Sequence, residues 1–221
     1  MSIPGPEPSE IIETKACLDA KKIRFEINKF LLPNSMEGEF GIIRHPGAAL
    51  AVPITDSGEV VILRQYRFAC SRRILEFPAG TLEAGESPLE SIKREVQEES
   101  GYSAKKWDNL GEMLPCPGYS DETIHLFLAR DLTKLNQKPE GDADEDIEVI
   151  KIAPEKLNEI SGSTILRTIG AIGLLFLGGT KKAKGFTKSI NKLQSASAAL
   201  AFSFGKALKF LRGFAAADDL L

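Results

Sequence analysis

The chain has 221 residues, 43% of them hydrophobic and 27% charged, which is typical of a soluble globular protein with one extended domain or two small domains. Its formal net charge of -3 argues against a nucleic-acid-binding protein, so no nucleic acid partner is expected. Cys17, Cys70 and Cys116 lie far apart, which argues against a disulfide framework or paired zinc ligands and favours a reducing, cytoplasmic location.

The first half of the chain is predicted to form strands, after a loosely ordered, proline-containing lead-in that ends near Lys22. Runs rich in β-forming residues and separated by turn residues are typical of strands. These runs are "IRFEINKFLL" (23–32), "GEFGIIRH" (38–45), "GAALAVPI" (47–54) and "EVVILRQYR" (59–67). The next run, "RILEFPAG", predicts a short strand that Pro78 and Gly80 end.

A helix is predicted between Ser87 and Gly101. Ser87 suits the N-cap, Pro88 suits the first helical position, and Glu90 completes a capping box. Gly101 suits the left-handed residue that often ends a helix. The apolar residues that recur at helical spacing, and that we expect in the core, are Leu89, Ile92 and Val96.

The second half of the chain continues the mixed pattern. Strands are predicted at "KWDNLGEML" (106–114), "TIHLFLARDL" (123–132) and "IEVIKIA" (147–153). The loop "PCPGYSDE" (115–122) joins the first two, and the acidic loop "PEGDADED" (139–146) precedes the third. With helices at 154–160 and 164–177, this order predicts an α/β fold in which helices pack on the faces of a sheet.

Glutamates crowd the helix and the loop before it, among them Glu86, Glu90, Glu95, Glu98 and Glu99. Like charges one turn apart destabilise a helix, so we expect something cationic to complete this site. The alternative is a solvated acidic face, which is common on surface helices. Carboxylates at positions i, i+3 and i+4 converge on one patch, and their hard oxygens suit Mg²⁺ or Mn²⁺.

The spacing around these glutamates resembles the signature of the Nudix hydrolases. Gly80 is followed by five residues and Glu86, then by seven residues, "REVQEE" (94–99), one residue, Gly101 and an apolar residue. The resemblance covers roughly residues 23–178. It implies a Nudix α/β/α sandwich with a mixed sheet that hydrolyses a nucleoside diphosphate linked to another group.

The resemblance also implies three metal ligands, which are Glu95, Glu99 and the backbone carbonyl of Ala79. Glu98 is implied as a further ligand or as a catalytic helper. Gly80 is expected to let the backbone turn so that the Ala79 carbonyl faces the metal. We expect Arg94 to orient the carboxylates rather than to contact substrate. For Glu86, anchoring the loop and assisting a metal both remain open.

Two further stretches resemble the ADP-ribose and nucleotide-sugar branch of the family: "RQYRFACSRRILEFPAGTLEAGE" and "PCPGYSDETIHLFLA". By this resemblance Arg67 holds a phosphate, because a guanidinium fork matches phosphate oxygens; the alternative is a surface arginine. Glu76 accepts hydrogen bonds from sugar or adenine, or is instead a structural partner of Arg72 or Arg73. Pro117 stands sixteen positions after the last glycine of the signature, where ADP-ribose members keep a proline.

The general base of this branch usually lies on an acidic loop, which corresponds here to residues 139–146. Glu145 is the residue that we expect to fill this role. Glu140, Asp142 and Asp144 are the alternative bases. The alternative for the loop as a whole is a solvated acidic loop.

The resemblance therefore implies Mg²⁺- or Mn²⁺-dependent hydrolysis of ADP-ribose, or of a related ADP-sugar, to AMP and a sugar phosphate. One alternative is the same fold acting on a UDP-sugar, NADH or a coenzyme A ester. Another is a non-catalytic module that senses ADP-ribose. The expected organisation is a lead-in with homodimer-forming strands (1–45), the Nudix domain (46–179) and a basic tail (180–221).

The tail is predicted to form an amphipathic helix with a basic polar face. Its apolar residues are Ile190, Leu193, Leu200, Phe204, Leu208 and Leu211. A basic amphipathic helix is typical of weak contact with a membrane surface, but it also suits packing against an acidic body or a partner subunit.

Overall fold

The computed structural model describes residues 9–139, 146–153 and 156. The chain divides into two units, Met1–Gly173 and Leu174–Leu221, and every described residue lies in the first. The predicted helices at 154–160 and 164–177 and the predicted basic tail lie outside the described residues. Within the described part, no helix combines the length and the apolar character needed to cross a membrane.

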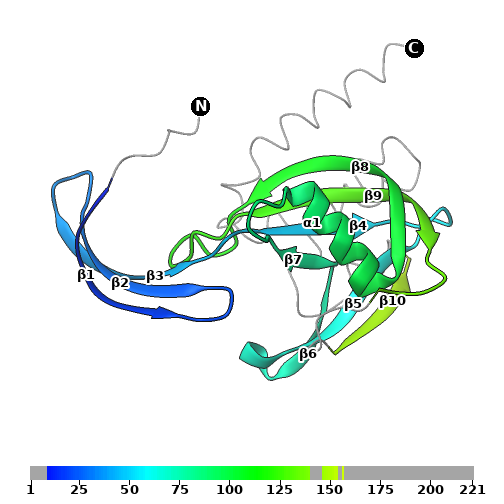
Figure 1. Ribbon diagram of the computed structural model, residues 1–221, viewed down its shortest axis with the longest axis horizontal. Coiled ribbons are helices and arrows are strands. Elements are labelled where there is room, and N and C mark those ends of the chain that lie inside the picture. The colour runs from blue at the N-terminus through cyan, green and yellow to red at the C-terminus, as the bar shows by residue number, and fades with distance from the viewer. Residues whose placement is uncertain (1–8, 140–145, 154–155, 157–221) are drawn as a thin grey trace, which may run out of the picture. The chain divides into compact units, whose positions relative to one another are not determined.

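The N-terminal sheet has the strand order β1-β2-β3, with β1 Glu10–Asp19, β2 Arg24–Leu31 and β3 Glu37–Arg44, all antiparallel (Figure 1, blue). Strands β2 and β3 were predicted, but the expectation of a loosely ordered lead-in up to Lys22 was wrong. Every residue of β1 is exposed, so the strand has no alternating apolar pattern to reveal it. Its structure comes from the ladder with β2.

A second sheet has the order β10-β5-β6, with β10 Ile147–Ile152, β5 Val60–Arg67 and β6 Arg72–Glu76. All its pairs are antiparallel, and the short helix η1 (Phe68–Cys70) lies in the connection between β5 and β6. The first four residues of β5 are almost completely buried, as their continuous apolar run predicts.

The third sheet has the order β7-β4-β9-β8 and is mixed, because β4 pairs parallel with β9 and antiparallel with β7. Its strands are β4 Ala48–Pro53, β7 Ala79–Thr81, β8 Tyr102–Met113 and β9 Ile124–Lys134. The short strand predicted in the run 73–80, ended by Pro78 and Gly80, is confirmed as β6, but β7 was not predicted and belongs to another sheet. Pro78 has no N–H for a ladder, and its carbonyl accepts from the Ala51 N–H at 3.0 Å as the chain passes from β6 to β7.

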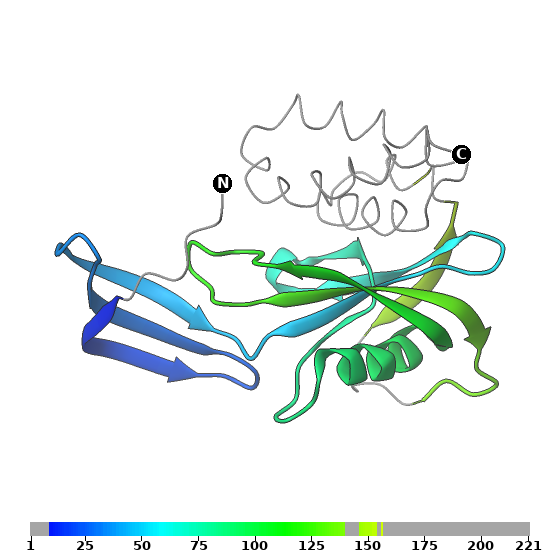
Figure 2. The same cartoon turned by 90° about the horizontal axis from the view of Figure 1, so that it is seen from above.

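The helix α1 (Pro88–Glu95) lies on one face of this third sheet (Figure 2). Ser87 caps it, and the predicted capping box with Glu90 is formed in both directions. The predicted core residues Ile92 and Val96 pack in a buried cluster with Ala49, Ala51, Phe127 and Ala129, and Leu89 packs partly buried against it.

The last turn of the helix differs from the regular geometry that was predicted. Residues Val96–Ser100 (η2) form a π-helical turn, and Gly101 ends it in the left-handed conformation with φ 72°. Such turns occur often at functional sites. Here the π-helical turn carries Glu98 and Glu99, so the carboxylates are presented from a widened helix end.

Candidate active site

Glu99 joins the end of the helix to strand β7. It is buried, with 2% of its surface exposed, and its Oε2 accepts a hydrogen bond from the Ala79 N–H at 2.9 Å. A buried carboxylate that accepts such a bond is held in one orientation. The structure thus brings together two of the predicted metal ligands, although they stand twenty positions apart in the chain.

Glu95 lies directly against Gly80. A Cβ atom at position 80 would lie 1.9 Å from Oε1 and 2.1 Å from Cδ of Glu95, so any side chain there would displace the carboxylate. Gly80 is not among the glycines with positive φ. The expectation that Gly80 supplies a special backbone conformation was therefore wrong, and the close approach of Glu95 is the reason for this glycine.

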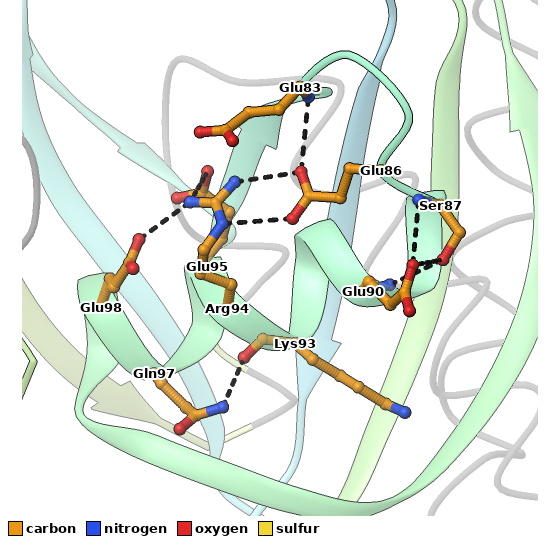
Figure 3. A network of polar contacts seen from close by, with 9 residues as sticks. All are labelled: Glu83, Glu86, Ser87, Glu90, Lys93, Arg94, Glu95, Gln97 and Glu98. Atoms are coloured by element: carbon orange, nitrogen blue, oxygen red, sulfur yellow. Dashed lines mark hydrogen bonds and ion pairs between the residues drawn. The ribbon is translucent and has the colours of Figure 1, made fainter.

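Arg94 gathers three carboxylates around one guanidinium group (Figure 3). Its Nη1 donates to Glu95 Oε1 and to Glu98 Oε2, each at 2.9 Å. Its Nε and Nη2 donate to the two oxygens of Glu86 at 3.2 and 3.3 Å. Glu86 also accepts from the Glu83 N–H at 3.4 Å, which favours an anchoring role in the loop. The predicted orienting contacts of Arg94 are thus present.

The contact between Arg94 and Glu86 shifts the pKa of both side chains. The hydrogen bond to Glu86, together with the charges of Glu95 and Glu86 and the bond to Glu98, raises the pKa of Arg94 despite its partial burial. The same bond lowers the pKa of Glu86 below its ordinary value of 4.5. Glu86 therefore stays ionised beside a permanently charged arginine.

Replacing Arg94 with glutamine should destabilise the metal-free protein at neutral pH and matter much less in acid. At pH 7 we expect the free energy of unfolding to fall by about 2 kcal/mol. A hydrogen bond to a charged group contributes about 1.5–3 kcal/mol, and the carboxylates that lose Arg94 gain hydrogen bonds to water in exchange. Since the Glu86 pKa is lowered in the folded protein, its stabilising contribution is complete above about pH 4.5 and is lost as the pH falls through the folded value. Urea unfolding with EDTA at pH 7 and pH 3.5 measures both values.

The matched control is Lys93→Gln, because Lys93 precedes Arg94 in the chain and extends away from this network (Figure 3). It should change the free energy of unfolding little at either pH. An Arg94→Gln penalty that stays constant from pH 7 to pH 3.5 would contradict the assigned pairing.

The donor set fits a divalent metal in its chemistry, although the ligands are not yet gathered around one point. Among the residues described, no group of three or more His, Cys, Asp or Glu side chains is arranged to hold a metal ion. Yet Glu95 and Glu99 offer carboxylate oxygens next to strand β7, and Glu98 is joined to Glu95 through Arg94. Such hard donors suit Mg²⁺ or Mn²⁺. A bound ion would share Glu95 and Glu98 with Arg94.

Arg67 on β5 and Glu76 on β6 are joined by a side-chain hydrogen bond, although Arg67 is paired with Arg72 and Glu76 with Leu63 in the register. The Arg67 Nε donates to Glu76 Oε2 at 2.8 Å. The predicted pairing of Glu76 with Arg72 or Arg73 was wrong, because its partner is Arg67. The predicted contact of Glu76 with substrate stays a prediction. Arg73 forms an ion pair with Asp146, at the end of the acidic loop.

An open depression of about 330 Å³ lies beside the glutamates, lined by α1, η2 and Pro139. Arg94 and Glu98 form part of its wall. Pro139, the first residue of the acidic loop and its last described residue before position 146, lines the same depression as Glu98. Glu145 itself, and the alternatives Glu140, Asp142 and Asp144, lie outside the described residues. Pro117 is exposed in a turn of the loop 115–122.

Residues 44–167 match the family model described as "NUDIX domain", which is more than half of the chain. The chain belongs to the Nudix family. The predicted membership is thereby confirmed, and the protein is a Nudix hydrolase. The signature from Gly80 to Tyr102, which we call the Nudix box or the box, lies wholly within the matched residues.

This Nudix hydrolase is similar to two bacterial proteins of comparable length. It is 38% identical over 144 residues to the "ADP-ribose pyrophosphatase" of Bacillus subtilis (strain 168), covering 65% of this chain and 78% of that protein. It is 32% identical over 167 residues to the "Methanol dehydrogenase activator" of Bacillus methanolicus, covering 75% and 90% respectively. A solved structure titled "Crystal structure of ADP compounds hydrolase" has the same fold, with a TM-score of 0.64, 21% identity, and coverage of 78% of this chain and 95% of that one.

Proposed function

We propose that this Nudix hydrolase cleaves the diphosphate of ADP-ribose, or of a related ADP-sugar, to AMP and a sugar phosphate. The observation that carries the proposal is the placement of Glu99 on Ala79 and of Glu95 against Gly80, with Glu98 linked to Glu95 through Arg94. The 38% identity to a protein named "ADP-ribose pyrophosphatase" supports the choice of substrate.

In the proposed reaction a water oxygen forms a bond to one phosphorus, and the bridging P–O bond breaks. Glu95, Glu99 and the Ala79 carbonyl would hold Mg²⁺ or Mn²⁺, which neutralises diphosphate charge and makes water a better nucleophile when bound. Glu98 helps to hold the cation or takes up a proton. Glu145 is proposed as the general base, since Pro139 at the start of its loop lines the same depression as Glu98.

Arg67 is proposed to bind a substrate phosphate. Its Nε is held by Glu76, while the side chain stays 44% exposed and its other nitrogens can reach a ligand. An arginine that is already oriented loses less freedom when it binds an anion. The contact favours a positioning role for Glu76 over direct recognition of sugar or adenine, and Pro117 is proposed to line the site from the loop 115–122.

We further propose that residues 1–45 form a homodimer interface, with the Nudix domain at 46–179. The N-terminal sheet exposes large apolar side chains that a second copy would cover: Ile11, Ile12, Leu18, Phe25, Leu31 and Phe40. A cytoplasmic location is proposed because all three cysteines are free. Contact of the tail (180–221) with membranes stays a prediction, which co-sedimentation with anionic liposomes before and after truncation at Gly179 would test.

The substrate is tested with a panel that holds ADP-ribose, other ADP-sugars, UDP-glucose, GDP-mannose, NADH and a coenzyme A ester, each with Mg²⁺ and with Mn²⁺. We expect the highest kcat/KM on ADP-ribose or another ADP-sugar, with AMP among the products. A maximum on UDP-glucose, NADH or the coenzyme A ester would replace the proposed substrate. Tight binding of ADP-ribose without turnover would support a sensor.

A further inference from the structure

The loop 115–122, which we call the Pro117 loop, is tied to the end of strand β3 by backbone hydrogen bonds. The Ile43 N–H donates to the Tyr119 carbonyl at 2.7 Å, and the Asp121 N–H donates to the Ile43 carbonyl at 3.2 Å. Ile43 thereby forms an isolated parallel bridge with Ser120. The N-terminal sheet and the Pro117 loop are therefore continuous at this point.

The Asp121 carboxylate reinforces this junction with both oxygens. Oδ1 accepts from the His45 backbone N–H at 2.8 Å, and Oδ2 accepts from Arg44 Nη1 at 3.1 Å. A half-exposed ion pair contributes little by itself, but its geometry is fixed here by a backbone hydrogen bond on the same side chain. Asp121 thus restricts the loop more than its exposure suggests.

Arg44 carries this contact on into strand β2. Its Nε donates to Glu26 Oε2 at 3.0 Å, and the same oxygen accepts from Asn28 Nδ2 at 2.9 Å. Arg24 lies 3.2 Å from the other oxygen of Glu26. Hydrogen bonds from Arg44 and Asn28 lower the pKa of Glu26, so it stays charged and keeps Arg44 in position.

The Pro117 loop and the Nudix box meet at the same end of strand β4. The Ala48 N–H donates to the carbonyl of Thr123, which directly follows the loop, at 2.9 Å. The neighbouring Gly47 carbonyl accepts from the Leu82 N–H of the box at 3.0 Å. A displacement of the Pro117 loop is therefore transmitted through this end of β4 to the box that carries the glutamates.

From this geometry we infer that Asp121 is a positioning residue for substrate: it holds the Pro117 loop on the N-terminal sheet, at the distance from the box that the nucleotide-sugar requires. The inference rests on the proposed function for its substrate. Asp121 acts through the loop and through Arg44, and it need not contact the reacting atoms. The N-terminal sheet thereby contributes to substrate binding, which is a role beyond joining two copies.

Steady-state kinetics of Asp121→Ala, Arg44→Ala and the double variant test the catalytic part of the inference. We expect KM for the best substrate of the wild-type protein to rise about 10-fold in each, with kcat changed less than about 2-fold, because loop position affects binding more than the reacting groups. KM of the double variant should be no higher than that of the more affected single variant, since both substitutions remove the same Arg44–Asp121 contact. Asp121→Asn keeps an acceptor for the His45 N–H and should restore part of the loss.

The matched control is Asp108→Ala. Asp108 is similarly exposed and accepts two hydrogen bonds from one arginine, Arg130, at 2.9 and 2.6 Å on the β8–β9 pair. This variant should leave KM unchanged. A kcat loss without a KM change in Asp121→Ala, or an equal KM rise in Asp108→Ala, would overturn the positioning role.

Amide hydrogen exchange on the substrate-free, full-length chain tests the junction independently of any activity. The Asp121 and Ile43 amides should exchange about 10-fold faster in Asp121→Ala and Arg44→Ala than in the wild type or Asp108→Ala. Unchanged exchange would overturn the inference. If these two variants exchange faster but the wild-type chain cleaves none of the panel, the proposed substrate is wrong while the junction is retained.

Discussion

Replacing Glu99 with glutamine should lower kcat on the best substrate about 1,000-fold, or about 4 kcal/mol in activation free energy. A neutral amide loses the charge that a divalent cation requires. The amide oxygen can still accept the hydrogen bond that the Ala79 N–H donates to Glu99, so the fold should persist. Steady-state rates, with calorimetric titration of Mg²⁺ and Mn²⁺ into the substrate-free protein, measure the two effects together.

Glu90→Gln is the matched control, because it makes the same chemical change on the same helix. Glutamine also serves in a capping box, so the Ser87 contact should be maintained and activity should stay near that of the wild type. If Glu99→Gln takes up metal as the wild type does and retains activity within about 10-fold, Glu99 is not a metal ligand.

The Gly80→Ala substitution should reduce kcat/KM about 100-fold or more. The new methyl group would lie 1.9 Å from Glu95 Oε1, and it can be accommodated only if the carboxylate moves away from strand β7. Displacing a ligand by about 1 Å is enough for a loss of this size. Metal affinity should fall as well, because Glu95 is one of the proposed ligands, and this can be measured without any substrate.

Gly58→Ala separates lost stability from lost site geometry. Gly58 has φ 82° and open space around it, so alanine there introduces backbone strain of about 1 kcal/mol without contact with the box. We expect a lower melting temperature with unchanged kcat/KM for this control. Should Gly80→Ala lose stability but keep its kcat/KM, the packing of Glu95 against Gly80 has no catalytic consequence.

The helix and its glutamates could be predicted from the sequence because they depend on contacts between near neighbours. Ser87 and Glu90 are three positions apart, so a capping box follows from residue type and spacing alone. Arg94, Glu95 and Glu98 lie within about one turn, so their contacts are also local, although the orienting role of Arg94 was expected from the family resemblance. The apolar spacing of Ile92 and Val96 likewise indicated the buried face.

Strand β1 and the pairing of Glu76 with Arg67 could not be predicted in this way. Each depends on which strand lies alongside in the sheet. An exposed strand such as β1 has no alternation of apolar residues from which its pairing could be predicted. Ile43 and Ser120 stand far apart in the chain, yet they meet in a bridge that places Asp121 on Arg44. No local pattern marks that contact.

The sequence by itself thus determined the helix ends, the apolar face, the family and the set of carboxylates, because these follow from residue types at short, fixed separations. Only the tertiary structure decided how they are used. In the folded chain the Ala79 N–H donates to Glu99, and Glu95 packs against the backbone of Gly80. The Pro117 loop is joined to the N-terminal sheet through Asp121 and Arg44. These contacts depend on sheet register and strand order, which long-range packing selects.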